Sequence, residues 1–423
     1  MGATDYLMVL PVRHFRVSCC LVAVEGSFAE HLRMLQDRIG DDAGRLVVAS
    51  PAMGIEDYKS RMQVMSIIDE ENEALSFYTL FSDDATHSPI GKIRRLPSIM
   101  WTLYSLTKQS FCVHSGLSWD VWLPFEFASI LFGLLLRRRT VFVVDIDYRN
   151  SAMMSYRVGD WSWKSYALCR YIYDTARSLQ LRVAARYCSI VLLKGRKMVT
   201  DFGSGRPNIK YILDASHSER NIIDVGSLEK KVKELGDESL PLRLTYFGRL
   251  TAYKGIDRCI QAVAMAKKAG ANVQLDIIGS GEQLDALRRI SAECDADSFV
   301  RFMGGRPFNQ QFYCLLHQYH LLLAAPLRED TPRTALDAMA AGVPYLAFDT
   351  YYYRELLESG AGRTVAWLDV EAMAQAIVEL DRNRQQLAIM VERSVAYARA
   401  NTQEIWLERR LAWTLPSKKS TLA

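Results

Sequence analysis

The chain has 423 residues, of which 49% are hydrophobic and 24% are charged, and its formal net charge is +4. This length is enough for two or three domains with sizeable cores, and the composition is that of a globular protein. A net charge this small gives no argument for binding nucleic acid. The eight cysteines form no C-x-x-C pair. Most of them lie in or beside apolar runs, which favours free thiols in a reducing compartment over a disulfide framework.

The N-terminal residues do not have the pattern of a secretory signal peptide. MGATDYLMVLPVRHF has an acidic residue early, lacks a basic start and has Pro11 within its apolar run. The most apolar stretch, Val121 to Leu136, contains Pro124 and Glu126 and is too short to span a bilayer. We therefore expect a buried helix there and a cytoplasmic protein.

Strands and helices alternate along the first half of the chain. Tyr6–Leu10 and LVVASP have the composition of strands, and between them Leu32, Leu35 and Ile39 have helical spacing. A further strand is expected within 70–81. The remaining expected strands are SFCVHSG, TVFVVDID, CSIVLLKG and IKYILD, and the expected helices cover 97–108, 123–138 and 163–186. Strands alternating with helices in this way predict βαβ crossovers and a parallel sheet.

The same alternation is clearest from Leu244 to Phe348. The strands expected in this half are LRLTYFG, VQLDIIG, FVRFMG, LLLAAP and VPYLAF. Between the halves, VGSLEKKVKELGDESLP is charged and ends in a proline, as in an exposed connector. We expect an α/β doubly wound domain over 1–224, a linker over 225–241, a second such domain over 242–400, and a helical tail over 401–423.

Four groups of residues follow the predicted strands of the second half. They are Gly248 with Arg249 and Lys254; Gly279 with Ser280 and Gly281; Arg328 with Glu329 and Asp330; and Asp337. Ligands of parallel sheets bind at the carboxyl ends of the strands. Two cations and a glycine turn at a helix N-terminus suit a diphosphate. The carboxylates suit sugar hydroxyls, because an ionised carboxylate only accepts hydrogen bonds.

GRLTAYKGID, DIIGSGE, and E-x7-D followed by AMAAGVP together resemble the donor half of GT-B glycosyltransferases, specifically glycosyltransferase family 4. The resemblance covers about Leu242 to Leu380 and is weaker before it. It implies the GT-B fold, in which two Rossmann-like doubly wound parallel-sheet domains face each other across a cleft. It also implies that a hexose-type sugar is transferred, with retention at the anomeric carbon, from a nucleotide diphosphate sugar. No metal and no other cofactor would be needed.

The resemblance implies roles for individual residues. Arg249 and Lys254 would hold the nucleotide diphosphate, and Gly279 would lie against the nucleotide. Glu329 would stand at the transferred sugar and Asp337 near the ribose. The family usually has Glu at the second acidic position, so Asp337, which is one methylene shorter, requires a small shift of its helix to make that contact.

Candidates in the first half are fewer. Gly26 lies where the family has its glycine-rich loop near the donor phosphates, with Ser27 in place of the usual second glycine; a plain helix-entry turn is the alternative. His114 ends SFCVHSG, where the family often has a histidine close to the sugar, and a solvated loop residue is the alternative. Asp145 and Asp147 replace a common His-Asp pair. They are candidates for binding an acceptor hydroxyl, although Asp147 is also placed to cap the turn.

Other chemistries lack the residues they need. HQYH, from His317 to His320, has no third ligand at metal-site spacing, and the chain has no P-loop motif. Two other classes with this fold remain open: a nucleotide-sugar epimerase, and a catalytically silent nucleotide-sugar-binding protein of an assembly complex.

Two basic clusters lie beside apolar segments of the first half, GKIRR at 91–95 and RRR at 137–139. Such clusters suit the anionic inner face of a cytoplasmic membrane, and a solvated basic face is the alternative. Peripheral contact with that membrane would favour a lipid-linked sugar acceptor, as in surface polysaccharide or glycolipid biosynthesis. Without such contact, a soluble sugar acceptor is expected.

Overall fold

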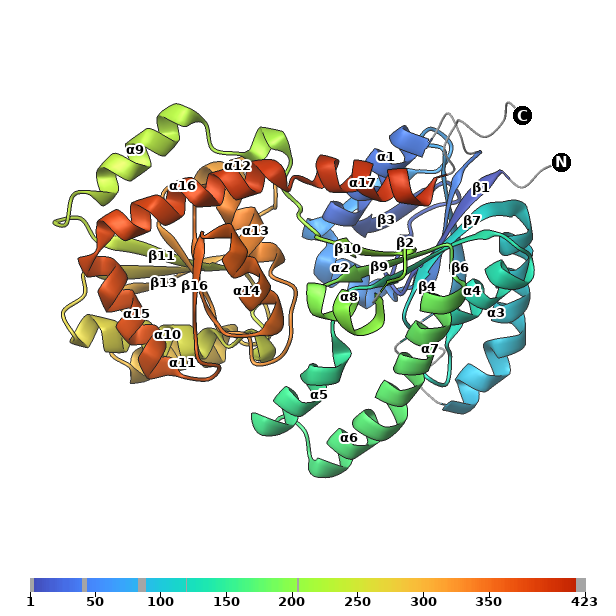
Figure 1. Cartoon of the computed structure of the whole chain (residues 1–423), viewed down its shortest axis with the longest axis horizontal. Coiled ribbons are helices and arrows are strands. Elements are labelled where there is room, and N and C mark those ends of the chain that lie inside the picture. The colour runs from blue at the N-terminus through green and yellow to red at the C-terminus, as the bar shows by residue number, and fades with distance from the viewer. Residues whose placement is uncertain (1–3, 40–43, 83–88, 119, 204, 416–423) are drawn as a thin grey trace. The chain divides into compact units, whose positions relative to one another are not determined.

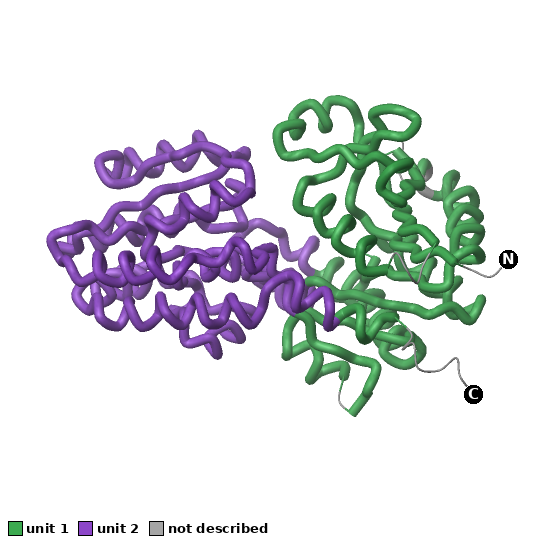
Figure 2. The backbone as a smooth tube through the Cα atoms, turned by 90° about the horizontal axis from the view of Figure 1, so that it is seen from above, with its two compact units in different colours: residues 1–145, 167–212, 410–423 green, residues 146–166, 213–409 purple. Residues whose placement is uncertain are grey.

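A computed structural model of the chain describes residues 4–39, 44–82, 89–118, 120–203 and 205–415. The chain divides into two compact units, shown in different colours in Figure 2. Unit 1 comprises Met1–Asp145, Ala167–Ile212 and Arg410–Ala423. Unit 2 comprises Ile146–Tyr166 and Leu213–Arg409.

The described residues of unit 1 contain a seven-stranded sheet with the order β10-β9-β8-β7-β1-β4-β6. Every neighbouring pair in it is parallel. Its strands are β1 (Asp5–Val9), β4 (Leu46–Ala52), β6 (Leu75–Ser82), β7 (Ser110–Gly116), β8 (Arg139–Val144), β9 (Ile190–Lys194) and β10 (Ile209–Ile212). Both faces are buried, which is why most of these strands appear in the sequence as continuous apolar runs.

The helices of unit 1 include the buried one expected around Phe125. It is α4 (Phe125–Leu135), and among the described residues no helix is long and apolar enough to cross a membrane. The others are α1 (Gly26–Ile39), α2 (Ile55–Arg61), α3 (Pro89–Gln109), α7 (Asp174–Tyr187) and α8 (Arg196–Gly203). A small antiparallel sheet, β2 (Phe15–Arg16), β3 (Leu21–Glu25) and β5 (Met65–Asp69), was not predicted.

Unit 2 has a second parallel sheet, with the order β13-β12-β11-β14-β15-β16 among its described residues. Its strands are β11 (Leu242–Phe247), β12 (Val273–Ile278), β13 (Val300–Gly304), β14 (Leu321–Ala324), β15 (Tyr345–Phe348) and β16 (Gly362–Val365). The expectation of doubly wound parallel sheets is confirmed in both units.

Helices cover both faces of the unit 2 sheet (Figure 1). One hydrophobic cluster joins the sheet to α10 (Ile256–Lys268), α11 (Leu284–Glu293), α15 (Val370–Arg382) and α16 (Arg384–Ala400). The other joins it to α12 (Gln310–Leu316), α13 (Arg333–Ala340) and α14 (Tyr351–Leu356). This packing on both faces fixes the positions of the strands and therefore of their carboxyl ends.

The segment expected to be an exposed connector differs from that expectation. Val225–Leu235 form helix α9, which belongs to unit 2. Lys231 of this helix is buried, and its ammonium group donates hydrogen bonds to three carbonyl oxygens, of Tyr319 (3.0 Å), Ala341 (2.6 Å) and Gly342 (3.0 Å). This segment is therefore a packed helix despite its charged composition, because one of its lysines is buried and donates hydrogen bonds to carbonyl groups inside the protein.

The two units also do not meet at the single boundary expected from the sequence, because each unit consists of more than one segment of the chain. Residues 146–166, expected in the first domain, belong to unit 2 and contain α5 (Tyr148–Arg157). The long helix expected over 163–186 consists of α6 (Trp163–Leu168), a π-helical turn (Cys169–Tyr173) and α7. The final helix, α17 (Gln403–Thr414), begins in unit 2 and ends in unit 1, where Arg139 Nη2 donates to the carbonyl of Trp413 at 2.8 Å.

Candidate functional site

The turn after β11 is shaped by a glycine. A 3₁₀ turn, Ala252–Lys254, leads to Gly255, which has φ 63° and begins α10. A Cβ at Gly255 would lie 1.9 Å from the carbonyl oxygen of Ala325, so a side chain is excluded there. The first turn of α10 therefore packs against the backbone after β14, and Lys254 is placed between these two strand ends.

The glycine turn after β12 lies directly on the first turn. A Cβ at Gly279 would lie 1.9 Å from the carbonyl oxygen of Gly248, and one at Gly281 would lie 2.4 Å from that of Leu250. The amide of Leu250 donates to the carbonyl of Ser280 at 2.9 Å. The glycines of DIIGSGE thus allow two backbone turns to touch, which brings together the first two groups of predicted residues.

Three cations meet around Tyr253, a residue that the sequence analysis did not single out. The Arg328 guanidinium lies over its ring, 4.0 Å from the centroid, and Arg249 Nη2 lies 3.5 Å from its hydroxyl oxygen. Lys254 pairs with Asp330. The amide of Leu327 donates to the carbonyl of Tyr253 at 2.8 Å, which joins the β11 and β14 loops. Such a group of cations suits an anion with several oxygens.

Glu329 lies beside these cations and is only 2% exposed. Its Oε1 accepts hydrogen bonds from Asn150 Nδ2 at 2.8 Å and from the amide of Tyr351 at 3.3 Å. Its Oε2 is buried and has no hydrogen-bond partner among the described residues. Burial raises the pKa of Glu329 above its ordinary value, whereas the hydrogen bonds from Asn150 and Tyr351 lower it. The arrangement leaves one carboxylate oxygen for a hydroxyl donor.

Asp337 is buried in α13 and has partners in the protein. Its Oδ1 accepts hydrogen bonds from the amides of Ser216 at 3.0 Å and His217 at 2.9 Å, and His217 Nδ1 lies 3.5 Å away. Asp337 therefore holds the segment through which the chain enters unit 2 for the second time. The sequence around Ser216 and His217 contains no pattern that predicts this attachment.

His114 does not lie at the exit of its strand as expected. It is an inner residue of β7, in register with Met8 and Val141, and the strand continues to Gly116. Its Nδ1 is hydrogen bonded to the hydroxyl of Tyr6 at 2.8 Å, and burial lowers its pKa to about 3. The side chain is only 4% exposed, which contradicts the alternative of a solvated loop residue.

The remaining candidates of the first half lie at two turns, one before α1 and one between β8 and α5. Gly26 is the first residue of α1 and directly follows β3 of the small antiparallel sheet, not a strand of the parallel sheet. Asp145 follows β8 and forms an ion pair with Lys194 at 2.9 Å. Asp147 caps α5: its carboxylate accepts from the amide of Arg149 at 3.1 Å and from that guanidinium at 2.9 and 2.7 Å. Asp147 is thus the cap that the sequence left open as an alternative.

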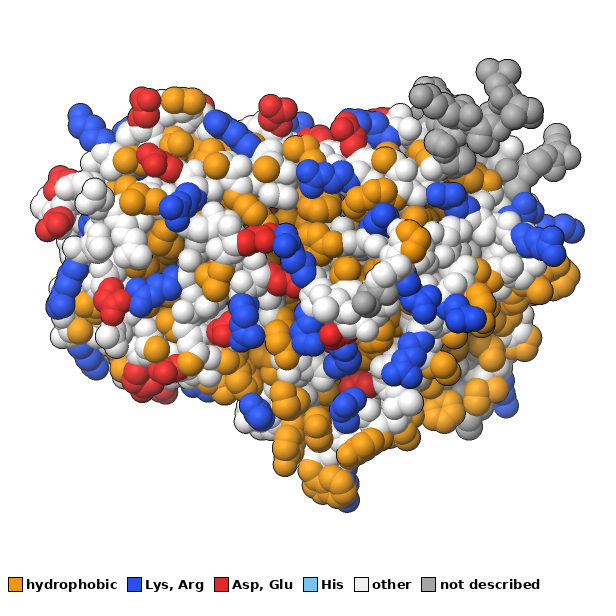
Figure 3. Space-filling model, viewed as in Figure 1, with side chains coloured by type: hydrophobic (Ala, Val, Ile, Leu, Met, Phe, Trp, Pro, Cys, Tyr) orange, Lys and Arg blue, Asp and Glu red, His pale blue; other side chains and the backbone are white. Residues whose placement is uncertain are grey.

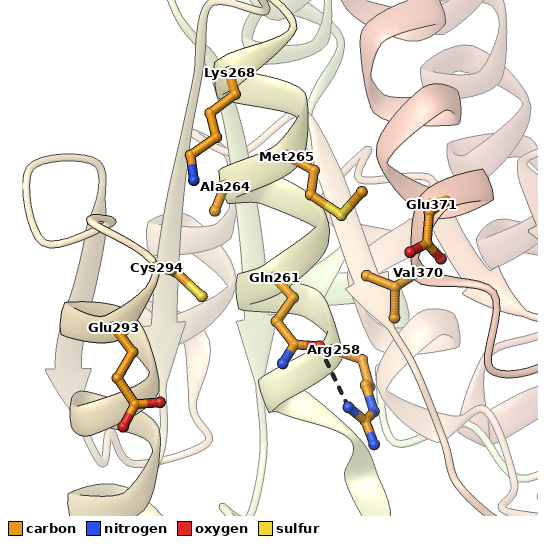
Figure 4. Close-up of a pocket in the computed structure, with 9 residues that line it drawn as sticks. All are labelled: Arg258, Gln261, Ala264, Met265, Lys268, Glu293, Cys294, Val370 and Glu371. Carbon is orange, nitrogen blue, oxygen red and sulfur yellow. Dashed lines mark hydrogen bonds between the residues drawn. The ribbon is translucent and has the colours of Figure 1, made fainter.

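Unit 2 also has a hollow of about 450 Å³. Figure 4 shows that its lining side chains come from the side of α10, the end of α11 and the start of α15. Within it Arg258 Nη1 donates to Gln261 Oε1 at 3.4 Å. The hollow contains none of the predicted site residues, so we assign the candidate site to the strand ends.

Metal-ligating residues do not cluster in the described part of the chain: it contains no group of three or more His, Cys, Asp or Glu side chains that could hold a metal ion. His320 of the HQYH run instead accepts a hydrogen bond from the amide of Arg243 at 3.1 Å through its Nδ1. Its own amide donates to the carbonyl of Arg243 at 2.8 Å. This histidine therefore joins the start of β14 to β11.

The family match found by comparison with known proteins lies within unit 2. Residues 228–398 match the family model described as Glycosyl transferases group 1, which is less than half of the chain. The GtfA subunit of UDP-N-acetylglucosamine–peptide N-acetylglucosaminyltransferase from Limosilactobacillus reuteri subsp. suis is 30% identical over 132 residues. This match covers 31% of the chain and about a quarter of that relative's length (25%). The amylovoran biosynthesis glycosyltransferase AmsK of Erwinia amylovora is 28% identical over 146 residues, 33% of the chain and 35% of its own length.

Similarity to solved structures extends over nearly the whole chain. The crystal structure of Anabaena Alr3699/HepE in complex with UDP has a TM-score of 0.63 and 15% identity, and the match covers 96% of this chain and 98% of that one. At this identity the likeness shows the fold, two parallel-sheet domains with covering helices. The expected GT-B fold is therefore confirmed.

Proposed function

We propose that this GT-B chain transfers a hexose-type sugar from a nucleotide diphosphate sugar to a hydroxyl of a sugar or lipid-linked sugar acceptor. The observation that carries the proposal is the arrangement at the strand ends of unit 2. Arg249, Lys254 and Arg328 gather around Tyr253, and the buried Glu329 follows Arg328 directly. Cations for a diphosphate thus stand next to a carboxylate for sugar hydroxyls, in the segment that matches the group 1 family model.

The leaving diphosphate sets the main electrostatic requirement. As the bond from the anomeric carbon to the phosphate oxygen breaks, negative charge develops on that oxygen. In the proposed reaction this charge is stabilised, without a metal, by the N-terminus of α10 and by the cations around Tyr253, namely Arg249, Lys254 and Arg328. The transfer rate in excess EDTA tests this step, and we expect activity to persist.

Retention at the anomeric carbon completes the proposed reaction. The acceptor oxygen forms its bond to the anomeric carbon on the face that the phosphate leaves, and the departing phosphate oxygen takes the acceptor proton. Glu329 orients the sugar by accepting a hydrogen bond from one of its hydroxyls at Oε2. In this scheme no side chain forms a covalent intermediate.

The names of the relatives indicate which donors and acceptors to test first. UDP is bound in the HepE structure, and UDP-N-acetylglucosamine is named for GtfA, so UDP-sugars are the first donors. AmsK is named for the biosynthesis of a polysaccharide, which favours an acceptor of that class. Thermal unfolding of this protein with a panel of UDP-, GDP- and ADP-sugars tests the donor, because a ligand of the native state raises its stability.

A basic and apolar surface on unit 1 supports a lipid-linked acceptor at a membrane. On α3 and α4, Trp101 is 71% and Leu135 is 71% exposed, and the exposed cations Arg94, Arg95 and Arg137 belong to α3 and to the turn after α4. Figure 3 shows apolar side chains with Lys and Arg on the right of that view, over these helices. Aromatic and aliphatic side chains edged by cations suit an anionic bilayer surface.

A further inference from the structure

Helix α5 is part of unit 2, although it directly follows β8, a strand of the unit 1 sheet. Its first residues are fixed by two kinds of contact: Asp147 caps the helix, and the amide of Asp147 donates to the hydroxyl of Tyr352 at 2.7 Å. Tyr352 belongs to α14, whose first amide, that of Tyr351, also donates to Glu329. The N-terminal turn of α5 is thereby held next to the carboxylate of Glu329.

Asn150, in the first turn of α5, makes the shortest contact of Glu329. Its Nδ2 donates to Oε1 at 2.8 Å, across 179 residues of sequence. Because an ionised carboxylate only accepts hydrogen bonds, the amide nitrogen of Asn150 must face it. With Oε1 occupied by Asn150 and by the amide of Tyr351, only Oε2 lacks a partner among the described residues.

We propose that Asn150 is a positioning residue for Glu329. By holding Oε1, it fixes the plane of the carboxylate and presents Oε2 to a hydroxyl of the donor sugar. This rests on the proposed function, since it assigns the presented oxygen to a sugar. The residue reaches the site from a segment outside the group 1 match, so two parts of the chain far apart in sequence supply one functional carboxylate.

The charged groups around Glu329 determine what the loss of Asn150 does to its titration. Burial has the largest effect on the pKa of Glu329 and raises it. The charge of Asp147 also raises this pKa, and the charge of Arg354 lowers it. Tyr352 is buried and its pKa lies well above its ordinary value, so it stays neutral. The neighbouring Asp330 is paired with Lys254. The hydrogen bond from Asn150 favours the ionised form, so its removal raises the pKa of Glu329.

The test measures the ionisation of Glu329 directly, by NMR titration of protein with 13C-labelled glutamate carboxyl groups. The resonance of Glu329 is assigned by its loss in Glu329→Gln. We expect its pKa to rise in Asn150→Ala and to rise further in Asn150→Asp, which keeps the shape but removes the donor and adds a like charge. Ser151→Ala, on the next position of α5, is the matched control and should leave the titration unchanged.

Turnover gives a second, independent readout. In Asn150→Ala, kcat should fall about tenfold at the acidic end of the pH range, and the loss should shrink as the pH rises and Glu329 ionises. In a Glu329→Gln background the same substitution should change kcat little further, because the two act as a unit. A merely structural role would lower kcat equally at every pH and in both backgrounds.

The outcomes separate this inference from the proposed function. An unchanged Glu329 titration in Asn150→Ala overturns the inference even if the protein transfers sugar. A shifted titration in a protein that transfers no sugar to any acceptor leaves Asn150 positioned against Glu329 and removes the proposed transfer.

Discussion

Asp337 Oδ1 accepts a hydrogen bond from the amide of His217 at 2.9 Å, although 120 residues separate them in the sequence. The amide of Ser216 donates to the same oxygen at 3.0 Å. One buried carboxylate thus satisfies two consecutive amides of the chain where it enters unit 2. Asp337, for which the family resemblance implies a contact with the ribose, thus has a structural role in this chain.

Removing this carboxylate should destabilise the protein. Asp337→Ala leaves two amides without their acceptor, so we expect the free energy of unfolding to fall by about 2 kcal/mol. Asp337→Asn keeps an acceptor oxygen and should lose clearly less. Urea denaturation of the three proteins measures the difference. Equal stability of Asp337→Ala and wild type would show that the contact contributes nothing to the free energy of unfolding. Affinity for a nucleoside diphosphate is a separate measurement: its loss in the still folded Asp337→Asn variant would support the ribose contact.

The diphosphate assignment predicts the effect of removing single cations. Arg249→Ala and Lys254→Ala should each reduce the transfer rate at least about tenfold, which corresponds to about 1.4 kcal/mol, because each removes a charge-assisted contact. Lys268→Ala is the matched control, since Lys268 is an exposed cation at the opposite, C-terminal end of α10. Near-normal rates in both site variants, or an equal loss in the control, would place the donor elsewhere.

Glu126 should make the stability of unit 1 depend on pH. It is 3% exposed, it accepts a hydrogen bond from Ser118 Oγ at 2.8 Å, and burial raises its pKa to about 7. In the unfolded chain its pKa is about 4.3. The folded state therefore favours the protonated form, and this contribution is complete below about pH 4.3 and is lost as the pH rises through about 7.

Glu126→Gln, which mimics the protonated side chain, should be the more stable protein at pH 8, by on the order of 3 kcal/mol. At pH 4.5 the two proteins should differ little. Urea denaturation at the two pH values gives the comparison, and a difference that does not change with pH would contradict the raised pKa.

The proposed contact of the surface on α3 and α4 with a membrane predicts binding to anionic vesicles. Neutralising Arg94, Arg95 and Arg137 should release the protein, since each cation contributes about 1 kcal/mol of attraction that salt screens. Arg138 and Arg139 are left intact, because they donate to the carbonyls of Lys108 and Trp413 within unit 1.

The control for this experiment neutralises three exposed cations of unit 2, namely Lys268, Arg288 and Arg289. Flotation with vesicles of anionic and of neutral lipid, at low and high salt, is the measurement. If wild type does not float with anionic vesicles at low salt, or if the control loses binding equally, the surface on α3 and α4 is not a membrane site.

The parallel sheets could be predicted from the sequence for a physical reason. Strands buried on both faces, such as β14 and β15, consist of apolar residues, and β12 is followed directly by the glycine turn at Gly279, so the strands and their carboxyl ends can be recognised in the sequence. The grouping of Arg249, Lys254 and Arg328 followed from that placement. Strand β2 was missed because its two residues are too few to show a period.

The contacts made by Asn150 and Lys231 could not be predicted in this way. Asn150 is a polar residue in a helix without a distinctive pattern, and its partner is 179 residues away. Lys231 belongs to a charged run whose composition is that of an exposed connector, yet three carbonyl groups surround its ammonium. Such contacts depend on which elements pack together, and local sequence patterns do not carry that information.

The most direct test of the proposed function is the release of nucleoside diphosphate from a nucleotide sugar in the presence and absence of acceptors. The donor is the nucleotide sugar that stabilises the protein most, and the acceptors are sugars and lipid-linked sugars. We expect release only when an acceptor is present, in equal amount with a product that carries the sugar in the configuration of the donor, and loss of both in Arg249→Ala. Stabilisation by a nucleotide sugar with no transfer to any acceptor, or conversion of the sugar without an acceptor, would contradict sugar transfer and favour a binding protein or an epimerase.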